Sequence, residues 1–328
     1  MIDTAYIKTA HKLLKENLGV RPGEKLSIIT DAQMLETAEI FQIASAPLDS
    51  KTVLAVIPTA RHRGQEPPEQ TVELMKSSDV ALLLTKFSIS HTIARLRATE
   101  AGARMASMGN VTPDMFEGAL SADYSKVARR AETISGYLFG GSEVRIKTAS
   151  GTDLTLSIAG RKAPFPDTGF YIERGQWGNL PAGEAFIAPL EDSLNGLLVA
   201  DSTIAPLGMV KEPVILHIDS GRIERIEGGP DAIALRSFFD GIGDPNALII
   251  AELGIGTNDR ARLTGKIIED EKKLGTLHLG FGMNIDFGGK NESKTHNDFL
   301  VLNPTLEIDG KTLLENGVFQ IELEVDQR

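Results

Sequence analysis

Short β-branched apolar runs alternate with helical segments over the first ~135 residues, and this alternation limits the fold more than any other feature. Helical spacing of apolar residues separates the strand-like runs. The runs lie at 25–30, 52–57, 80–84 and 104–108, and the helical segments at 31–45, 67–77 and 91–101. Such alternation is typical of a parallel sheet with helices on both faces. We therefore expect an α/β domain of the Rossmann-like kind over residues 1–137.

The pattern changes after Gly136. Residues 143–148 and 153–158 alternate apolar and polar side chains around a turn, which predicts a hairpin. Further strands are expected at 214–218, 222–227, 248–253, 276–280, 306–308 and 318–323, and helices at 231–239 and 259–273. The segment 161–208 is rich in Gly, Pro, Asn and Asp and predicts a long loop. We therefore expect a strand-rich α+β domain over residues 138–328.

Composition narrows the possible chemistry. The chain has no cysteine, which excludes disulfides, thiolate zinc sites, iron–sulfur clusters and cysteine nucleophiles. The net charge of −11 argues against a nucleic-acid partner. No signal peptide is visible at the N-terminus, and no apolar run approaches the ~20 residues that span a membrane. We expect a cytoplasmic protein with no membrane partner.

Two histidines lie in segments suited to metal binding. His278 ends a strand-like run, and His296 is followed two positions later by Asp298. In extended chain, residues two apart project to the same side, so His296 and Asp298 can chelate one ion. A second histidine would complete a set of two histidines and one carboxylate, which suits Fe(II), or half of a binuclear site.

Two glutamates extend this set. Glu252 interrupts an apolar run, where a lone buried carboxylate is costly without a cation. Glu184 lies in the glycine- and proline-rich segment. Three carboxylates with two imidazoles suit a pair of Zn²⁺, Co²⁺ or Mn²⁺ ions that activate a bridging water. The alternative for Glu252 is an ordinary charge on the solvent face of a strand end.

Four segments resemble the aminopeptidase T / aminopeptidase S family of metallo-aminopeptidases. They are LPAGEAFIAPLEDSLN at 180–195, AELGIGTN at 251–258, GTLHLGFG at 275–282 and SKTHNDFLV at 293–301. The resemblance runs over most of the chain. It implies a Rossmann-like N-terminal domain and a C-terminal domain that binds two metal ions.

The resemblance also assigns functional residues. It implies metal ligation by five side chains: Glu184, Glu252, His278, His296 and Asp298. It implies a homodimer that releases N-terminal residues from peptides. The first hypothesis is therefore an aminopeptidase in which a metal-bound water attacks the peptide carbonyl and one of the glutamates, with Glu252 as the candidate, shuttles the proton.

The chain departs from that family in the absence of one tyrosine and in the short segment, 18 positions long, from His278 to His296. The family has a functional tyrosine shortly after the strand histidine, but this chain has Met283-Asn284-Ile285 there. A relative of the same fold, 2,5-dihydroxypyridine dioxygenase, is similar in the same segments and implies one Fe(II) on His278, His296 and Asp298. A third hypothesis is a binding module that kept the fold and lost the chemistry.

Two residues of the first half are candidates for contact with a peptide or small-molecule substrate. His91 follows a strand of the expected parallel sheet at its carboxyl end, where ligands bind. The alternative is that this segment only caps a helix through Ser90 or Thr92. Trp177, the one tryptophan, either walls a pocket or anchors its loop. The pattern Gly254-x-Gly256 indicates close packing near the metal site rather than a phosphate loop.

Overall fold

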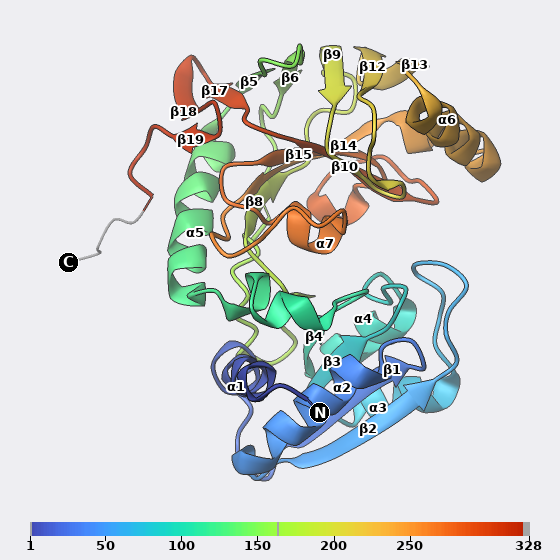
Figure 1. Ribbon diagram of the computed structural model, residues 1–328, viewed down its shortest axis with the longest axis vertical. Coiled ribbons are helices and arrows are strands. Elements are labelled where there is room, and N and C mark those ends of the chain that lie inside the picture. Colours follow the sequence, from blue (N-terminus) through green and yellow to red (C-terminus); the bar gives the residue numbers. More distant parts are fainter. Residues whose placement is uncertain (1, 163, 324–328) are drawn as a thin grey trace. The chain divides into compact units, whose positions relative to one another are not determined.

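The computed structural model describes residues 2–162 and 164–323, which form two compact units (Figure 1). Unit 1 comprises Met1–Tyr124 and Gly169–Ala182, and unit 2 comprises Ser125–Thr168 and Gly183–Arg328. The domain boundary expected after residue 137 falls inside helix α5 (Tyr124–Gly140). The described helices include none that is long and apolar enough to cross a bilayer.

Unit 1 contains a five-stranded parallel sheet in the order β2-β1-β3-β4-β7. Its strands are β1 Lys25–Asp31, β2 Lys51–Ile57, β3 Val80–Leu84, β4 Arg104–Ser107 and β7 Trp177–Asn179. Its helices are α1 Thr4–Lys12, α2 Leu35–Ser45, α3 Glu69–Lys76 and α4 Ile93–Glu100. All of β3 is buried, as expected of a central parallel strand covered on both faces. The predicted Rossmann-like domain class is confirmed.

Unit 2 contains two antiparallel sheets, which confirms the strand-rich second half. The eight-stranded sheet has the order β13-β12-β9-β6-β5-β17-β18-β19, and the six-stranded sheet has the order β11-β10-β16-β15-β14-β8. The strands of the first are β5 Glu143–Lys147, β6 Asp153–Ser157, β9 Asn195–Ala200, β12 Val214–Asp219, β13 Arg222–Glu227, β17 Thr305–Ile308, β18 Lys311–Glu315 and β19 Val318–Phe319. Those of the second are β8 Glu184–Ile187, β10 Thr203–Ile204, β11 Gly208–Met209, β14 Ile250–Gly256, β15 Leu277–Gly282 and β16 His296–Val301.

One hydrophobic core joins the two sheets of unit 2. Leu253 and Ile255 of β14, Leu277 and Leu279 of β15 and Phe299 of β16 cluster with apolar side chains of the eight-stranded sheet and of helices α5 and α6 (Pro230–Ile242). Successive side chains of a strand point to opposite faces. The residues between these apolar positions therefore point away from the core, and the candidate ligands are among them.

Three expectations for secondary structure were wrong or too long. The segment 161–208 is not a long loop, because it contains β7 to β10 and the start of β11. These strands are short and carry glycine and polar residues, so they lack a clear period of two. The strand expected at 318–323 is only Val318–Phe319.

The helix expected at 259–273 is reduced to the four-residue helix α7, Ile267–Asp270. The Asp270 carboxylate accepts hydrogen bonds from the backbone N–H groups of Thr264 and Gly265 and from the hydroxyls of Thr264 and Thr203. Glu269 likewise accepts the N–H of Arg262. Side-chain acceptors that capture backbone donors compete with helix formation, so this segment folds as a loop.

Asp270 is therefore expected to carry much of the stability of this loop. Asp270→Asn should lower the free energy of unfolding by about 2–4 kcal/mol, because the amide N–H₂ faces donors that then lack an acceptor. Urea unfolding followed by circular dichroism measures the loss. The matched control is Asp240→Asn on the exposed side of α6, which should change stability by less than about 0.5 kcal/mol. Equal stability of the two variants would contradict this role.

Candidate metal centre

The five candidate ligands lie on four neighbouring strands of the six-stranded sheet. Glu184 is on β8, Glu252 on β14, His278 on β15, and His296 and Asp298 on β16. Each alternates with residues of the hydrophobic core, so all five project from the opposite face of the sheet. The strand period that buries the core brings the predicted ligands together, and in β14 a bulge between Ile250 and Glu252 turns Glu252 to the same face as the others.

Each candidate ligand lies opposite a glycine of the adjacent strand. Glu184 is paired with Gly256, His278 with Gly254 and His296 with Gly282, while Glu252 and Asp298 both flank Gly280. A Cβ added to Gly254 would lie 2.1 Å from the His278 ring, and one added to Gly280 would lie 2.6 Å from His296 Nε2. The glycines therefore provide the space that the imidazoles occupy. The predicted close packing at Gly254-x-Gly256 is confirmed.

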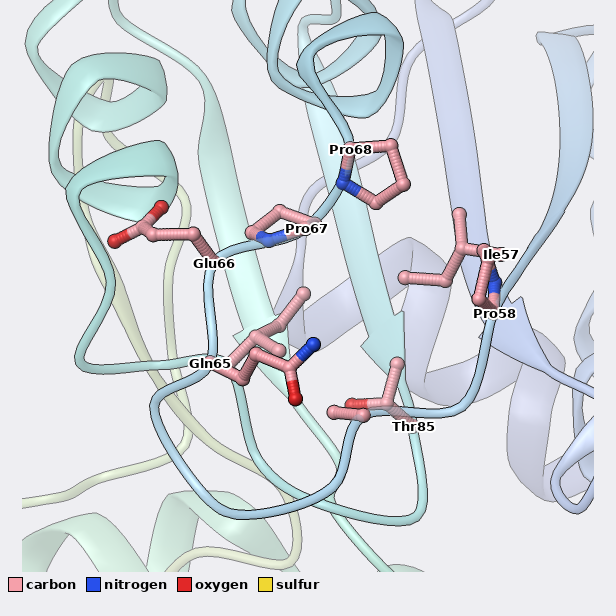
Figure 2. Close-up of a pocket in the computed structure, with 9 residues that line it drawn as sticks. Ile57, Pro58, Gln65, Glu66, Pro67, Pro68 and Thr85 are labelled. Atoms are coloured by element: carbon pink, nitrogen blue, oxygen red, sulfur yellow. The ribbon is translucent and has the colours of Figure 1, made fainter.

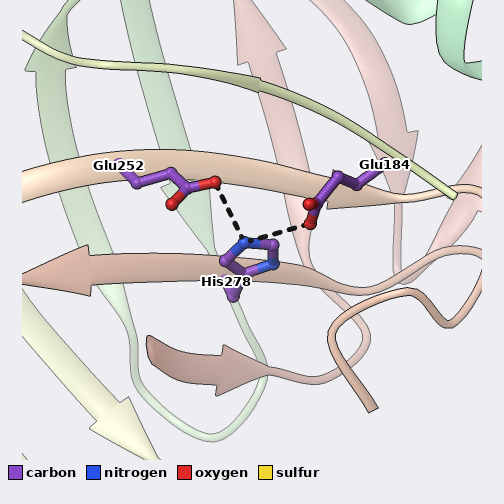
Figure 3. Close-up of side chains that lie close together, drawn as sticks. All are labelled: Glu184, Glu252 and His278. Atoms are coloured by element: carbon purple, nitrogen blue, oxygen red, sulfur yellow. Dashed lines mark ion pairs between the residues drawn. The ribbon is translucent and has the colours of Figure 1, made fainter. Parts of the chain in front are cut away.

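The imidazoles of His278 and His296 converge on Glu252. Glu252 Oε1 lies 3.5 Å from His278 Nε2, and Glu252 Oε2 lies 3.0 Å from His296 Nε2. On its other side His278 Nε2 lies 3.5 Å from Glu184 Oε2, as Figure 3 shows. His296 Nε2 also lies 2.9 Å from Asp298 Oδ1. Both Nε2 atoms thus face carboxylate oxygens that have the geometry of a ligand set.

The remaining atoms of these side chains are consistent with a bound cation. His296 Nδ1 lies 2.8 Å from the carbonyl oxygen of Met283, so Nδ1 donates there and Nε2 is left as the ligand atom. Glu184 Oε2 is buried and has no hydrogen-bond partner among the described residues, which leaves it free for an ion, whereas the buried His278 Nδ1 also lacks a partner, so no acceptor there orients this ring. Two groups of side chains bring their ligand atoms within 4.8 Å of one another and share Glu252: Glu184, Glu252 and His278; Glu252, His296 and Asp298.

In the metal-free protein the closeness of these carboxylates and imidazoles shifts their pKa values. Burial by itself would lower the pKa of His278, but Glu252 and Glu184 raise it to about 9. Burial would also lower the pKa of His296, but the nearby Asp298 carboxylate raises it well above its usual value. Against the effect of burial, the two imidazoles hold the pKa of Glu252 well below its usual range. Burial raises the pKa of Glu184 to about 8. A divalent ion would replace the protons that now balance these charges.

The donor set defines what the centre can do. Two imidazoles with one carboxylate form the ligand set of non-haem Fe(II) enzymes. A carboxylate that faces both imidazoles, as Glu252 does, is also the arrangement of a bridging ligand between two ions. The residues therefore fit a metal ion, and their geometry is compatible with either nuclearity.

A family model for 2,5-dihydroxypyridine 5,6-dioxygenase matches residues 7–321. The chain belongs to this family. Over 186 residues it is 28% identical to the 2,5-dihydroxypyridine 5,6-dioxygenase of Pseudomonas putida, and this stretch covers 53% of each protein. It is 27% identical over 184 residues to aminopeptidase AmpS of Bacillus subtilis, covering 50% of this chain and 44% of that protein. The matched part thus spans about half the length of each relative.

Two solved structures share the fold of this dioxygenase-family chain. The 2,5-dihydroxypyridine dioxygenase of Pseudomonas putida superposes with a TM-score of 0.83 at 20% identity, covering 97% of this chain and 98% of that one. Aminopeptidase AmpT of Thermus thermophilus superposes with a TM-score of 0.69 at 16% identity, covering 97% and 99%. The aminopeptidases, to which the motifs were first compared, are therefore the more distant relatives. The chain was compared first with the aminopeptidases, and that order was wrong because the dioxygenase is the more similar relative.

The sequence did not indicate three charged residues that lie beside the centre: Asp167, Glu271 and Lys272. Lys272 is buried and forms ion pairs with Glu184, Glu271 and Asp167. Although burial alone would lower it, these carboxylates raise the pKa of Lys272 well above its ordinary value. Glu271 also forms a ligand-like group with His278 and Asp298. In the sequence, Glu271 and Lys272 belong to a charged run that looks like the solvated side of a helix, so only burial identifies them.

The two proposed substrate contacts lie in unit 1 and touch each other. The rings of His91 and Trp177 meet edge to face with centroids 5.8 Å apart, and the Arg95 guanidinium lies 3.9 Å from the Trp177 ring centroid. Trp177 is on strand β7 and not in a loop. Thr92 caps α4 by accepting the N–H of Arg95, as the alternative interpretation of this segment expected. Contact of His91 and Trp177 with substrate stays a prediction.

Unit 1 has a cavity of about 300 Å³ at the carboxyl end of its sheet (Figure 2). It is lined by Ile57, Pro58, Ala60, Gln65, Glu66, Pro67, Pro68, Thr85 and Ile89. Neither His91 nor Trp177 lines it. Glu66 at its rim accepts the N–H groups of Ile93 and Ala94 at the start of α4. The carboxylate is thus already used to cap a helix.

Gly254→Ala is expected to displace the His278 imidazole, because the added Cβ would overlap the ring. The affinity for a divalent ion should fall roughly 10–100-fold, as it does when support for a ligand is lost. Isothermal titration with Mn²⁺ measures this. The matched control is Gly241→Ala in α6, where an added Cβ meets nothing within 4 Å. Unchanged affinity in Gly254→Ala would contradict a ligand role for His278.

The raised pKa values of His278 and Glu184 predict how the metal-free protein responds to pH. Folding favours the protonated forms of both groups, so stability is lost as pH rises from 4.5 through about 8 for Glu184 and from 6.5 through about 9 for His278. The melting temperature of chelator-treated protein should therefore fall over this range, whereas the increase caused by added metal should grow, because ligation requires a neutral imidazole. Scanning calorimetry measures both. A metal-free melting temperature that is as pH-dependent in His278→Gln as in the wild type would oppose the assignment.

Proposed function

We propose that the chain is a mononuclear Fe(II) dioxygenase that opens the ring of a dihydroxylated pyridine. The observation that carries the proposal is the convergence of the His278 and His296 imidazoles on the Glu252 carboxylate, with Asp298 beside His296, in a chain that belongs to the 2,5-dihydroxypyridine 5,6-dioxygenase family. His278, His296 and Asp298 would hold the iron. An iron ion on two histidines and one carboxylate keeps open positions for dioxygen and substrate.

The rest of the site supports this assignment over a peptidase. The stretch Met283-Asn284-Ile285 has no tyrosine hydroxyl to assist a tetrahedral transition state. The Asn284 amide instead donates to Glu191 and, through its oxygen, accepts the N–H of Asn291, so this position holds a loop in place. The fold likeness to the dioxygenase, at a TM-score of 0.83, also exceeds that to the aminopeptidase, at 0.69.

Two residues beside the proposed iron ligands then have definite roles. Met283, through its carbonyl, fixes the His296 ring so that Nε2 faces the ion. Glu252, whose pKa the two imidazoles hold well below its usual range, stays ionised and faces both of them, so it would balance the charge of the ion rather than take up a proton. The hydrophobic core behind the sheet keeps the ligands rigid.

A metallo-aminopeptidase is the second candidate function. The observation that favours it is the position of Glu252 between the two imidazoles, as expected for a ligand that bridges two ions. Glu252 would then assist a metal-activated water against a peptide bond. The homodimer implied by this family and the cytoplasmic location expected from the sequence are also proposals, of which light scattering tests the first.

Protein purified anaerobically and loaded with Fe(II) should bind iron and consume about one dioxygen per molecule of 2,5-dihydroxypyridine, because a dioxygenase transfers both oxygen atoms to its substrate. An oxygen electrode and the loss of ring absorbance measure the reaction. In His296→Ala both iron binding and oxygen uptake should fall to background, because one of three ligands is gone. His62→Ala, at an exposed position of unit 1, is the matched control and should behave as the wild type.

The same preparation separates the two candidates. Absence of oxygen uptake with iron-loaded protein across a panel of hydroxylated pyridines would reject the dioxygenase. Hydrolysis of amino-acid amides by Zn²⁺-, Co²⁺- or Mn²⁺-loaded protein, lost in His296→Ala, would establish the aminopeptidase in its place.

A further inference from the structure

Two phenylalanines lie beside the candidate metal centre, on the face of the sheet that carries the ligands. Phe186 follows Glu184 by two positions on β8, and its neighbours Ala185 and Ile187 belong to the hydrophobic core. Because successive side chains of a strand alternate, Phe186 projects from the same face as Glu184. The ring of Phe287 meets the Phe186 ring edge to face, with centroids 5.5 Å apart. The two rings therefore form one aromatic pair on the ligand side of the sheet.

This pair reaches the candidate ligand His296. The Phe287 ring meets the His296 imidazole edge to face, with centroids 5.2 Å apart. The His296 side chain is 23% exposed, whereas the side chains of the other four candidate ligands are at most 9% exposed. The solvent-accessible side of the centre is therefore at His296, where Phe287 lies.

Glu191 holds the loop that carries Phe287. The Glu191 carboxylate accepts the backbone N–H of Lys290 at 2.6 Å and forms an ion pair with Arg161. Arg161 also donates to the carbonyl oxygen of Gly288, directly after Phe287, at 3.0 Å. The loop is thus fastened on both sides of Phe287, so this ring is presented to the centre in a defined position.

Support of the His296 imidazole does not account for the whole pair. The Met283 carbonyl oxygen already orients this imidazole through Nδ1 at 2.8 Å. Phe186 and Phe287 are only half-buried, so each keeps accessible surface beside the centre. Aromatic side chains pack on other rings in edge-to-face or offset geometry. The accessible surface of this pair therefore suits a flat ring better than a charged or a small aliphatic group.

We propose that Phe186 and Phe287 form an aromatic wall against which the flat ring of the substrate packs beside the metal ion. The inference deepens the proposed function and rests on its premise that a ring-shaped substrate binds at this centre. The two residues determine specificity, because they favour a ring over an aliphatic group that offers the same atoms to the metal. One aromatic contact of this kind is worth about 2–10-fold in affinity.

Two chelators with the same metal-binding atoms separate the contribution of the ring from that of the metal bond. Benzohydroxamate has a phenyl ring where acetohydroxamate has a methyl group. Each is titrated calorimetrically into full-length protein loaded with Mn²⁺. The wild type should bind benzohydroxamate roughly tenfold more tightly, because both phenylalanines contact its ring.

Leucine variants test the two residues one at a time. Phe186→Leu and Phe287→Leu should each reduce the preference for benzohydroxamate by about 2–10-fold. The affinity for acetohydroxamate and the content of bound Mn²⁺ should not change, because the metal ligands are intact. Phe139→Leu, at an exposed position of α5, is the matched control and should behave as the wild type.

Two results with the leucine variants would overturn the proposal. The first is an unchanged preference for benzohydroxamate in both variants. The second is an equal loss of affinity for both chelators, which marks a purely structural role for the rings. If a leucine variant does not fold, the wild type and the tyrosine variants decide. Equal affinity of the wild type for both chelators overturns the proposal, whereas a preference that Phe186→Tyr and Phe287→Tyr retain supports it.

The proposed function fails separately from this inference. A wild type that prefers benzohydroxamate but consumes no dioxygen with 2,5-dihydroxypyridine would leave the aromatic wall intact and reject the dioxygenase. A wild type that consumes dioxygen but shows no preference for the ring of benzohydroxamate would reject only the aromatic wall.

Discussion

The pairing of each candidate ligand with a glycine across the strands β8, β14, β15 and β16 is the constraint on which the centre depends. Burial of the apolar side chains on one face of the sheet sets the register, because a slip of one residue would move every side chain to the other face. With that register, carboxylates and imidazoles gather on the opposite face. The glycines opposite them leave the space in which the His278 and His296 rings lie. The alternation of side chains along these strands thus places the core on one face of the sheet and the candidate ligands on the other.

The buried carboxylates of unit 2 each have a compensating partner close by. Buried carboxylates are costly unless a cation or hydrogen bonds compensate them. Asp270 is compensated by four donors, Glu184 and Glu271 by Lys272, and Glu252 and Asp298 by the imidazoles. A bound metal ion would compensate the charges of Glu252 and Asp298 in place of the protonated imidazoles. A fold shared by dioxygenases and aminopeptidases can therefore support different chemistry through the residues that neighbour a common ligand set.

Sequence patterns predicted those parts of the fold in which local and tertiary preferences agree. The buried strand β3 and the strand β13 lie at the residues expected from their apolar runs. The helix expected at 259–273 failed because Glu269 and Asp270 draw backbone N–H groups into a loop. The strand β7 was missed because a three-residue edge strand that contains Gly178 and Asn179 has no periodic signal. In the first case the hydrogen bonds join residues only five to seven positions apart, but the spacing of apolar residues does not reveal them. In the second case the pairing partner, β4, is distant in the sequence.

By itself the sequence determined the two fold classes and the five chemically suited side chains, because strand alternation and residue type are local properties. Only the tertiary structure decided that Glu252 lies between the two imidazoles, that glycines open the space for them, and that Lys272 is buried against Glu184. The physical reason is that burial and ion pairing depend on which strands become neighbours. A lysine in a charged run has the same sequence signature whether it ends in water or among three carboxylates.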